Sequence, residues 1–347
     1  MGRNILPMAR HHCLILTDPH DYRSRLRGAD QQVMILARGD YRAELTHLDF
    51  GNVLVQRSRQ SLPHVATAGA HPELTSIVML SDPHQPEIRV NGVDAGHCDL
   101  LVLAAGAEHH HRAGADSRWG STTMRTAQLL ASAHALLGRE MPPPSVTRLV
   151  TPDPAAIGRL RSLQERGVAL AAAPGGLHAN VATALRHAFV QTMVDCLVAD
   201  QHFGASVRLD GRSVAVVQRF MTRVEADLGR PLFMIDLCEE LGVAGRTLRQ
   251  YCLGHLGMSP NRYLLLRRMN LARRALERGG AATTVTQVAN EYGFGELGRF
   301  AVRYRQLFGE TPSATLRRSA GFLRHGPARC GPPMAAEGRP ATFRCPA

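Results

Sequence analysis

The chain has 347 residues, of which 44% are hydrophobic, so it is long enough for two domains with sizeable cores and needs no disulfide or metal for folding. Its formal net charge is +12, and all 41 basic residues are arginine. Seven cysteines are scattered without a Cys-x-x-Cys pair, which argues against a secreted, disulfide-stabilised protein. No apolar run approaches the roughly 18–20 residues that span a bilayer, which argues against a membrane-spanning protein. Together these features predict a cytoplasmic protein.

The N-terminal part of the chain has the pattern of a β domain. Residues 1–30 are expected to form an arm, and residues 31–122 alternate apolar and polar residues in short runs separated by turn signals. Asn91-Gly92 predicts a two-residue hairpin. We expect an antiparallel β-barrel or sandwich with strands at 33–37, 43–50, 52–57, 75–80, 88–90 and 100–104.

A histidine-rich segment lies within this part of the chain, at Glu108-His109-His110-His111. Alternate side chains of a strand face opposite sides, so at most His109 and His111 converge. A cupin-like metal site also needs a nearby carboxylate, and Asp116 lies beyond the expected strand. We expect no metal, no cofactor and no catalytic residue, and an exposed or pH-sensitive loop is the simpler interpretation. No nucleophile elbow, Walker loop or GxGxxG motif occurs in a strand–turn–helix context.

From Thr123 the apolar spacing changes to that of a helix, which should end near Gly138. Two further helical stretches follow at about 154–166 and 178–200, completing a domain over 31–200. These helices could pair two copies of the chain or pack on their own β domain. Residues 201–212 read as a polar linker, and residues 321–347, rich in Pro, Gly and Arg, as a disordered tail.

The segments 237–264 and 288–316 are two imperfect copies of one pattern. Each predicts a short helix, a turn entered at Gly242 or Gly293, and a second helix that ends at a glycine shortly before Pro260 or Pro312. The repeat therefore predicts two helix-turn-helix units. The matched positions are Leu237, Glu240, Gly242, Leu248, Gly257, Pro260 and Leu264 in the first copy and Val288, Glu291, Gly293, Phe300, Gly309, Pro312 and Leu316 in the second.

Residues 213–320 resemble the DNA-binding domain of the AraC/XylS family of bacterial transcription regulators. The resemblance rests on the string 285–294, on Leu271-Ala272-Arg273-Arg274, and on Phe300, Tyr304, Phe308-Gly309 and Thr311-Pro312. It implies an α+β multidomain protein, with a β-rich, cupin-like barrel or sandwich, following helices, and a C-terminal all-α domain of two helix-turn-helix units. It also implies a homodimer paired through 123–200, an unidentified small-molecule effector, and activation of transcription through contact with RNA polymerase.

The segment 213–320 also concentrates the positive charge, with 16 arginines against 9 acidic residues. Such a distribution suits binding to double-stranded DNA, although a solvated basic face would produce it too. The second helix of each unit, which in such motifs enters the major groove, is called its reading helix; the expected reading helices are 245–256 and 296–308. A helix over 261–278, which begins at Ser259-Pro260, joins the two units. Thr284 and Gln287 form an expected capping box for a helix over 285–292.

Residues for DNA contact follow from the faces of the two reading helices. In the first, Leu248, Tyr251, Cys252 and His255 share the core face, and the candidates for DNA contact are Arg246, Thr247, Arg249 and Gln250. In the second, Phe300, Tyr304, Leu307 and Phe308 are expected to be buried, and the candidates are Gly298, Arg299, Val302, Arg303, Arg305 and Gln306. Arg and Gln can each form two bonds to one base, whereas contacts to phosphate alone would position the protein without reading sequence.

Two features weaken these expectations. The exposed face of the second reading helix has small and apolar residues near its start, which offer few hydrogen bonds to bases. We therefore expect weaker sequence readout from this helix. Phe233 and Ala244 stand where the family usually has a capping Ser or Thr, and Gln250 and Val302 where it usually has Arg. The leading hypothesis is a sequence-specific, non-enzymatic transcription regulator; the alternatives are a non-specific architectural DNA-binding protein and a metal-binding sensor or enzyme.

Overall fold

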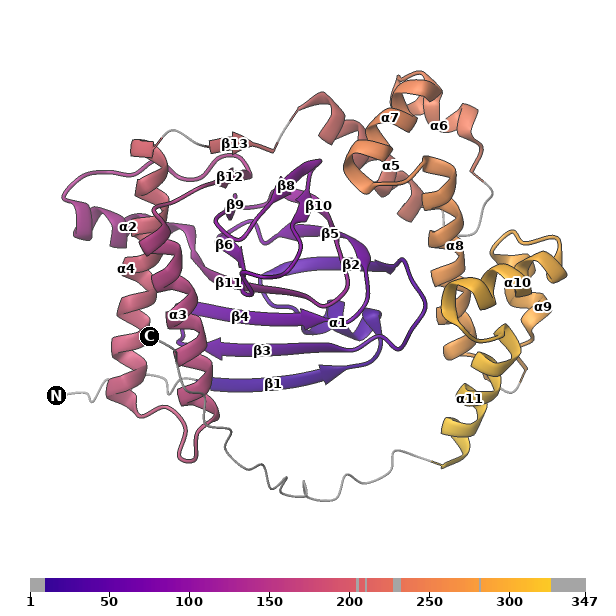
Figure 1. Ribbon diagram of the computed structural model, residues 1–347, viewed down its shortest axis with the longest axis horizontal. Coiled ribbons are helices and arrows are strands. Elements are labelled where there is room, and N and C mark those ends of the chain that lie inside the picture. Colours follow the sequence, from indigo (N-terminus) through magenta and orange to yellow (C-terminus); the bar gives the residue numbers. More distant parts are fainter. Residues whose placement is uncertain (1–9, 204–205, 210, 227–231, 281, 326–347) are drawn as a thin grey trace, which may run out of the picture.

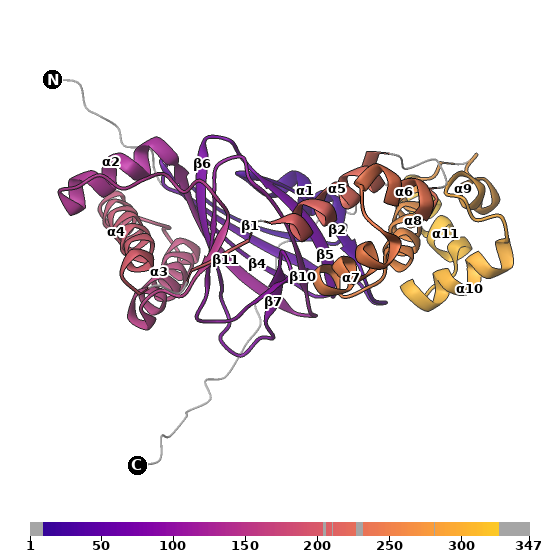
Figure 2. The same ribbon diagram turned by 90° about the horizontal axis from the view of Figure 1, so that it is seen from above.

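The computed structural model describes residues 10–203, 206–209, 211–226, 232–280 and 282–325. A β region occupies the middle of the molecule, with one group of helices on each side (Figure 1, Figure 2). The strands are β1 (Arg10–Leu16), β2 (Ala29–Ile35), β3 (Ala43–Asp49), β4 (Val53–Gln60), β5 (His64–Ala70), β6 (Leu74–Leu80), β7 (Ile88–Val90), β8 (Val93–Ala95), β9 (Leu100–Leu103), β10 (Glu108–Ala113), β11 (Ser117–Arg125), β12 (Arg148–Val150) and β13 (Ser206–Arg208). The helices are α1 (Pro19–Arg25), α2 (Thr126–Leu137), α3 (Pro154–Ala172), α4 (Ala179–Phe203), α5 (Arg212–Ala226), α6 (Met234–Leu241), α7 (Gly245–Leu256), α8 (Pro260–Glu277), α9 (Val285–Glu291), α10 (Leu297–Phe308) and α11 (Pro312–His325).

The strands form two antiparallel sheets that face each other. The larger has the order β1-β3-β4-β11-β6-β9-β12-β13 and the smaller the order β2-β5-β10-β7-β8. Residues from both sheets line one cavity, so the sheets are the two layers of a sandwich. The expected β-rich domain with following helices is confirmed, but the sheets do not close into a barrel.

Helices α2, α3 and α4 cover the larger sheet. Leu160 of α3 and Phe189 and Met193 of α4 are fully buried and belong to one apolar cluster with Leu48 of β3 and Val55 of β4. This is the arrangement in which the helices pack on their own β domain. Gly138 ends α2 in the left-handed conformation, as the sequence predicts.

Several segments differ from expectation. Residues 10–16, placed in an N-terminal arm, form β1, which pairs with β3 along its whole length, and α1 follows. Within the expected linker, β13 pairs with β12. None of the expected strand ranges covers β5, β11 or β12, and residues 123–125, where a helix was expected to begin, still belong to β11. The Asn91-Gly92 hairpin between β7 and β8 is confirmed, with φ of 47° and 87°. Helix α11 extends to His325, and the rest of the expected disordered tail lies outside the described residues.

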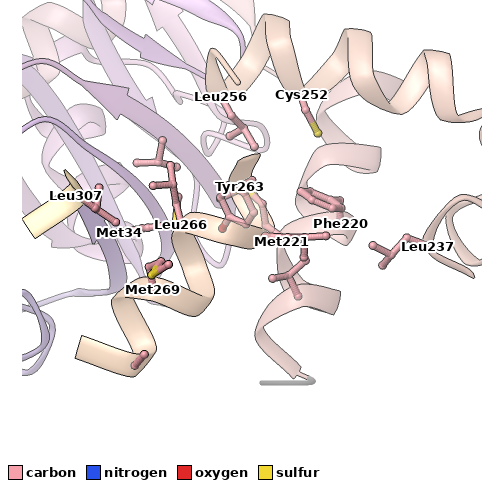
Figure 3. Packing of buried hydrophobic residues seen from close by; sticks show 14 of the residues in the cluster. Met34, Phe220, Met221, Leu237, Cys252, Leu256, Tyr263, Leu266, Met269 and Leu307 are labelled. Atoms are coloured by element: carbon pink, nitrogen blue, oxygen red, sulfur yellow. The ribbon is translucent and has the colours of Figure 1, made fainter. Parts of the chain in front are cut away.

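The C-terminal helices pack directly on the smaller sheet. Met34 of β2 and Val65 of β5 are buried in the same apolar cluster as Leu256 of α7 and Leu266 of α8, and Figure 3 shows Met34 next to Leu266. At the edge of the sheet, Asn270 of α8 accepts a hydrogen bond from the N–H of Ile35 (3.2 Å) and donates one to its carbonyl (3.1 Å). The two parts of the chain therefore share a continuous core.

Within the described ranges, no helix has both the length and the apolar composition needed to cross a membrane.

Candidate nucleic-acid interface

The two halves of the repeat fold alike, beginning with their turns. Helix α6 ends at Gly242, which has a φ of 65°, and the N–H groups of Gly242 and Val243 bond to the carbonyls of Glu239 (3.1 Å) and Cys238 (3.1 Å). The same pair of bonds closes α9, from Gly293 to Asn290 (3.0 Å) and from Phe294 to Ala289 (2.8 Å). This pattern is a Schellman motif, which turns the chain sharply between two helices. Both predicted helix-turn-helix units are therefore present.

Equivalent apolar residues fix each second helix against its first. Leu237 of α6 and Leu248 of α7 are buried, as are their counterparts Val288 of α9 and Phe300 of α10. The capping box of α9 is confirmed: Gln287 N–H donates to the Thr284 hydroxyl (3.2 Å), and Thr284 N–H donates to the Gln287 side chain (3.1 Å). Helix α6 has no such side-chain cap at Phe233, in line with the sequence.

The candidate residues of α7 lie on its exposed face. Arg246, Arg249 and Gln250 are exposed and Thr247 is half-buried. Leu248 and Cys252 are buried on the opposite face, as expected. The helix spans Gly245–Leu256 and ends at Gly257 in the left-handed conformation, so three polar side chains project from its first half.

The candidates of α10 are exposed as well. Gly298, Arg299, Val302, Arg303, Arg305 and Gln306 all face solvent, and the predicted core residues Phe300, Tyr304, Leu307 and Phe308 are buried. Arg299 already pairs with Glu296 (3.0 Å), and both side chains are well exposed, so the pair is weak. Val302 is 58% exposed, which leaves its side chain available on the same face.

Helix α8 joins the two units, and several of its arginines are engaged within the protein. Arg267 pairs with Glu225 of α5, and Arg273 pairs with Glu277 (2.8 Å) and lies over the Phe308 ring (4.8 Å). Arg268 lies 5.3 Å from the centre of the Phe294 ring. These three arginines of α8 therefore already have partners within the protein.

One residue of the first reading helix has a partner that the sequence does not reveal. His255, expected in the core of the helical domain, is buried against the β sandwich, and its Nδ1 lies 3.0 Å from Nε2 of His110 on β10. Next to it, Arg89 of β7 donates a hydrogen bond to the carbonyl of Gly254 (3.2 Å). Because 145 residues separate the two histidines, no local pattern could have indicated this contact.

The other histidines of β10 occupy the opposite face of the strand. His109 and His111 stack with ring centres 5.7 Å apart, as alternation predicts for residues two apart. Burial lowers the pKa of His109 to about 4, and burial and the neighbouring histidines hold the pKa of His111 well below its usual value. In the part of the chain that the structure describes, no three His, Cys, Asp or Glu side chains are grouped so that they could hold a metal ion.

Comparison with known proteins identifies the C-terminal domain. Residues 237–318 match the family described as Helix-turn-helix domain. The chain is 37% identical over 103 residues to the Probable thc operon regulatory protein of Rhodococcus erythropolis and 35% identical over 102 residues to the XylDLEGF operon transcriptional activator of Pseudomonas putida. These segments cover 29% of this chain and 31% and 32% of the two relatives, so the chain aligns with only about a third of their length.

Solved structures of the same kind also match. A probable AraC family transcriptional regulator from Rhodopseudomonas palustris is 34% identical and covers 30% of this chain and 98% of its own, with a TM-score of 0.29. The AraC-like transcriptional activator CuxR is 14% identical and covers 76% of this chain and 95% of its own, with a TM-score of 0.39. Given the family match and the sequence relatives, residues 237–318 are a helix-turn-helix domain of the AraC/XylS type, and through this domain the chain belongs to the AraC/XylS family.

Proposed function

We propose that this protein is a sequence-specific transcription regulator that binds double-stranded DNA through α7 and α10. The observation that carries the proposal is the duplicated helix-turn-helix, in which each second helix buries one face and exposes a polar one. In such motifs the second helix enters the major groove, and two units on one protein read segments about one helical turn apart. Helix α8 holds the two units in one core and thereby supports a fixed spacing.

The proposed roles of individual residues differ between the two helices. Arg246 and Gln250 are the proposed base-reading residues because both are exposed on α7 and each can form two bonds to a base edge. Thr247, Arg249, Arg299, Arg303, Arg305 and Gln306 are proposed to hold phosphates, and Val302 and Gly298 to allow close approach, with Val302 meeting a thymine methyl group. The first unit should therefore contribute most of the sequence readout.

Further parts of the proposal concern regulation. Relatives matched over the C-terminal domain carry the name transcriptional activator, which supports activation, with contact to RNA polymerase, as the mode of action. We propose that the β sandwich responds to an effector and that the protein acts as a homodimer through the outer faces of α3 and α4. An effector can shift the protein between two arrangements only if it binds one of them more tightly.

The test is selection of binding sites from a pool of genomic DNA fragments at physiological salt. Wild-type protein is compared with an Arg246→Ala/Gln250→Ala variant and with an Arg25→Ala/Gln128→Ala control, which removes the same kinds of side chain from exposed positions of α1 and α2. Wild type and control should enrich one motif whose features are about one helical turn apart. The reading-helix variant should lose about 1–3 kcal/mol of discrimination for each base contact removed.

Featureless enrichment that is equal for all three proteins would instead favour a non-specific architectural protein.

A further inference from the structure

Strand β10 presents its three consecutive histidines to two different places. His109 and His111 line the cavity between the two sheets, whereas His110 lies on the other face of the strand and contacts His255 on reading helix α7. The alternation of side chains along a strand produces this division. One strand in the interior of the smaller sheet, between β5 and β7, thus separates the cavity from the DNA-binding domain.

The cavity has the size and the walls of a small-molecule site. Its volume is about 100 Å³, similar in magnitude to the roughly 150 Å³ of an engineered apolar cavity that binds benzene. Most of its wall is apolar, including Val78, Leu80, Ile88, Val90 and Leu101. Trp119, the only tryptophan of the chain, also lines it.

The polar groups of the cavity select for an uncharged ligand. The Nδ1 atom of His109 is buried and has no hydrogen-bond partner among the described residues. The two charged side chains of the lining are already engaged, Arg27 with Asp49 (3.2 Å) and Asp99 with Gly96 N–H (2.8 Å) and the Thr151 hydroxyl (2.8 Å). A ligand here would find the unsatisfied imidazole nitrogen of His109 and the unsatisfied hydroxyl of Ser121 in largely apolar surroundings, which suits a compact molecule with one hydroxyl or similar group.

The opposite face of β10 holds the last turn of α7. The backbone N–H of His110 is fixed by Asn91 (2.9 Å), and its side chain shares a single hydrogen bond with His255 (3.0 Å). Gly92, in the turn between β7 and β8, packs on the same contact, because a Cβ added there would lie 3.0 Å from the ring of His255. A displacement of β10 would therefore reach the last turn of α7 through the His110–His255 hydrogen bond.

We propose that a small uncharged molecule with one hydrogen-bonding group binds between the sheets at His109 and that β10 couples its binding to α7 through the His110–His255 contact. The binding step and the coupling are properties of the protein without DNA, and only the regulatory meaning rests on the proposed function. The coupling must be reciprocal, so whatever moves α7 away from β10 also changes the affinity of the cavity.

The binding step is tested with three probes of one shape, namely cyclohexanol, methylcyclohexane and cyclohexanecarboxylate. Each is titrated into full-length protein without DNA and followed by Trp119 fluorescence and calorimetry. Cyclohexanol should bind saturably with one site and about fivefold more tightly than methylcyclohexane, as expected for one added hydrogen bond, and the carboxylate should not bind. In His109→Leu the preference for cyclohexanol should disappear, whereas His109→Gln, which keeps a hydrogen-bonding group, should retain it.

The coupling is tested by the nitrogen resonances of histidine side chains in protein labelled with ¹⁵N-histidine. Cyclohexanol should shift the His255 signals of the wild type, although His255 does not line the cavity. In His110→Leu cyclohexanol should still bind saturably at one site, but the His255 signals should no longer respond to it. His134→Leu, which removes an exposed histidine of α2, should behave as wild type in both measurements.

Equal binding of the alcohol and the carboxylate, or no saturable binding of the alcohol, would overturn the assignment of the site. Binding without any change at His255 in the wild type would overturn the coupling. A failure to select a DNA motif would leave both results unaffected and would count against the proposed function alone.

Discussion

The buried histidines make a quantitative prediction about stability and pH. Burial lowers the pKa of His47 and His109 to about 4, with nearby Arg27 and His12 adding to the effect at His47. Burial, together with His255 and His109, lowers the pKa of His110 to about 3. In the unfolded chain each imidazole titrates near its ordinary pKa of 6.5, so below that pH the unfolded state binds protons that the native state does not bind. Stability should therefore fall as the pH drops below about 6.5 and keep falling until the native pKa is reached.

The size of this fall follows from the two pKa values. At about pH 5 a histidine whose pKa is 6.5 when unfolded and about 4 or less when folded costs about 2 kcal/mol of unfolding free energy. These three residues alone should cost about 6 kcal/mol, which is comparable with the roughly 5–15 kcal/mol stability of a typical domain, and His111, whose pKa is also lowered by burial, adds to the fall. Urea unfolding followed by Trp119 fluorescence between about pH 7.5 and pH 5 measures the fall in the β sandwich.

Substitution of one of these histidines tests whether the buried imidazoles cause the fall in unfolding free energy at low pH. The variant His109→Leu should lose about 2 kcal/mol less than the wild type over the same pH range, because the proton uptake of one buried histidine is gone. The exposed His134→Leu should lose as much as the wild type. The reasoning would be refuted if the free energy of unfolding stayed constant down to about pH 5. It would also be refuted if His109→Leu lost as much unfolding free energy as the wild type. Either result would show that the native imidazoles are protonated as easily as unfolded ones.

Two further predictions concern the helical domain. The change Thr284→Ala should lower its unfolding free energy by about 1 kcal/mol through loss of the capping box, measured by urea titration with Thr283→Ala as the control; equal effects of the two changes would contradict a capping role. The change Glu225→Gln should cost about 3–5 kcal/mol, because Arg267, whose side chain is 12% exposed, would remain as a buried charge without its partner. The double variant with Arg267→Met should recover much of that loss, and no recovery would mean that the ion pair itself is not the cause.

The helical domain was the part of the fold that the sequence predicted best, because its signals are local. Gly242 and Gly293 mark the turns, and the helix periodicity around Leu248 and Phe300 places the buried faces. The bounds of α7 agree with expectation residue by residue, and those of α8, α9 and α10 within one residue. The exposure of the candidate contact residues follows from the same periodicity, whereas their roles toward DNA stay predictions.

The β sandwich was harder to predict because pairing, and not composition, creates several of its strands. Strand β5 has the sequence His-Val-Ala-Thr-Ala-Gly-Ala, with few residues of high β propensity, yet it pairs with β2 on one side and β10 on the other. Similarly, β1 depends on β3 for its existence as a strand. The contact between His110 and His255 depends on how the two domains pack, so it could be found only in the folded structure.

The hydrogen bonds between Asn270 and strand β2 have a consequence for aggregation when the helical domain separates from the β sandwich. β2 is the outermost strand of its sheet, and such strands invite pairing with other chains through their free backbone groups. Asn270 offers Ile35 the same donor and acceptor that a neighbouring strand would supply. The packing of α8 on β2 thus covers part of the edge strand. A β sandwich produced without the C-terminal helices would expose this edge to solvent. Self-association of that fragment through edge pairing is the expected result, and a charged residue introduced at Val33 on the same strand should suppress it.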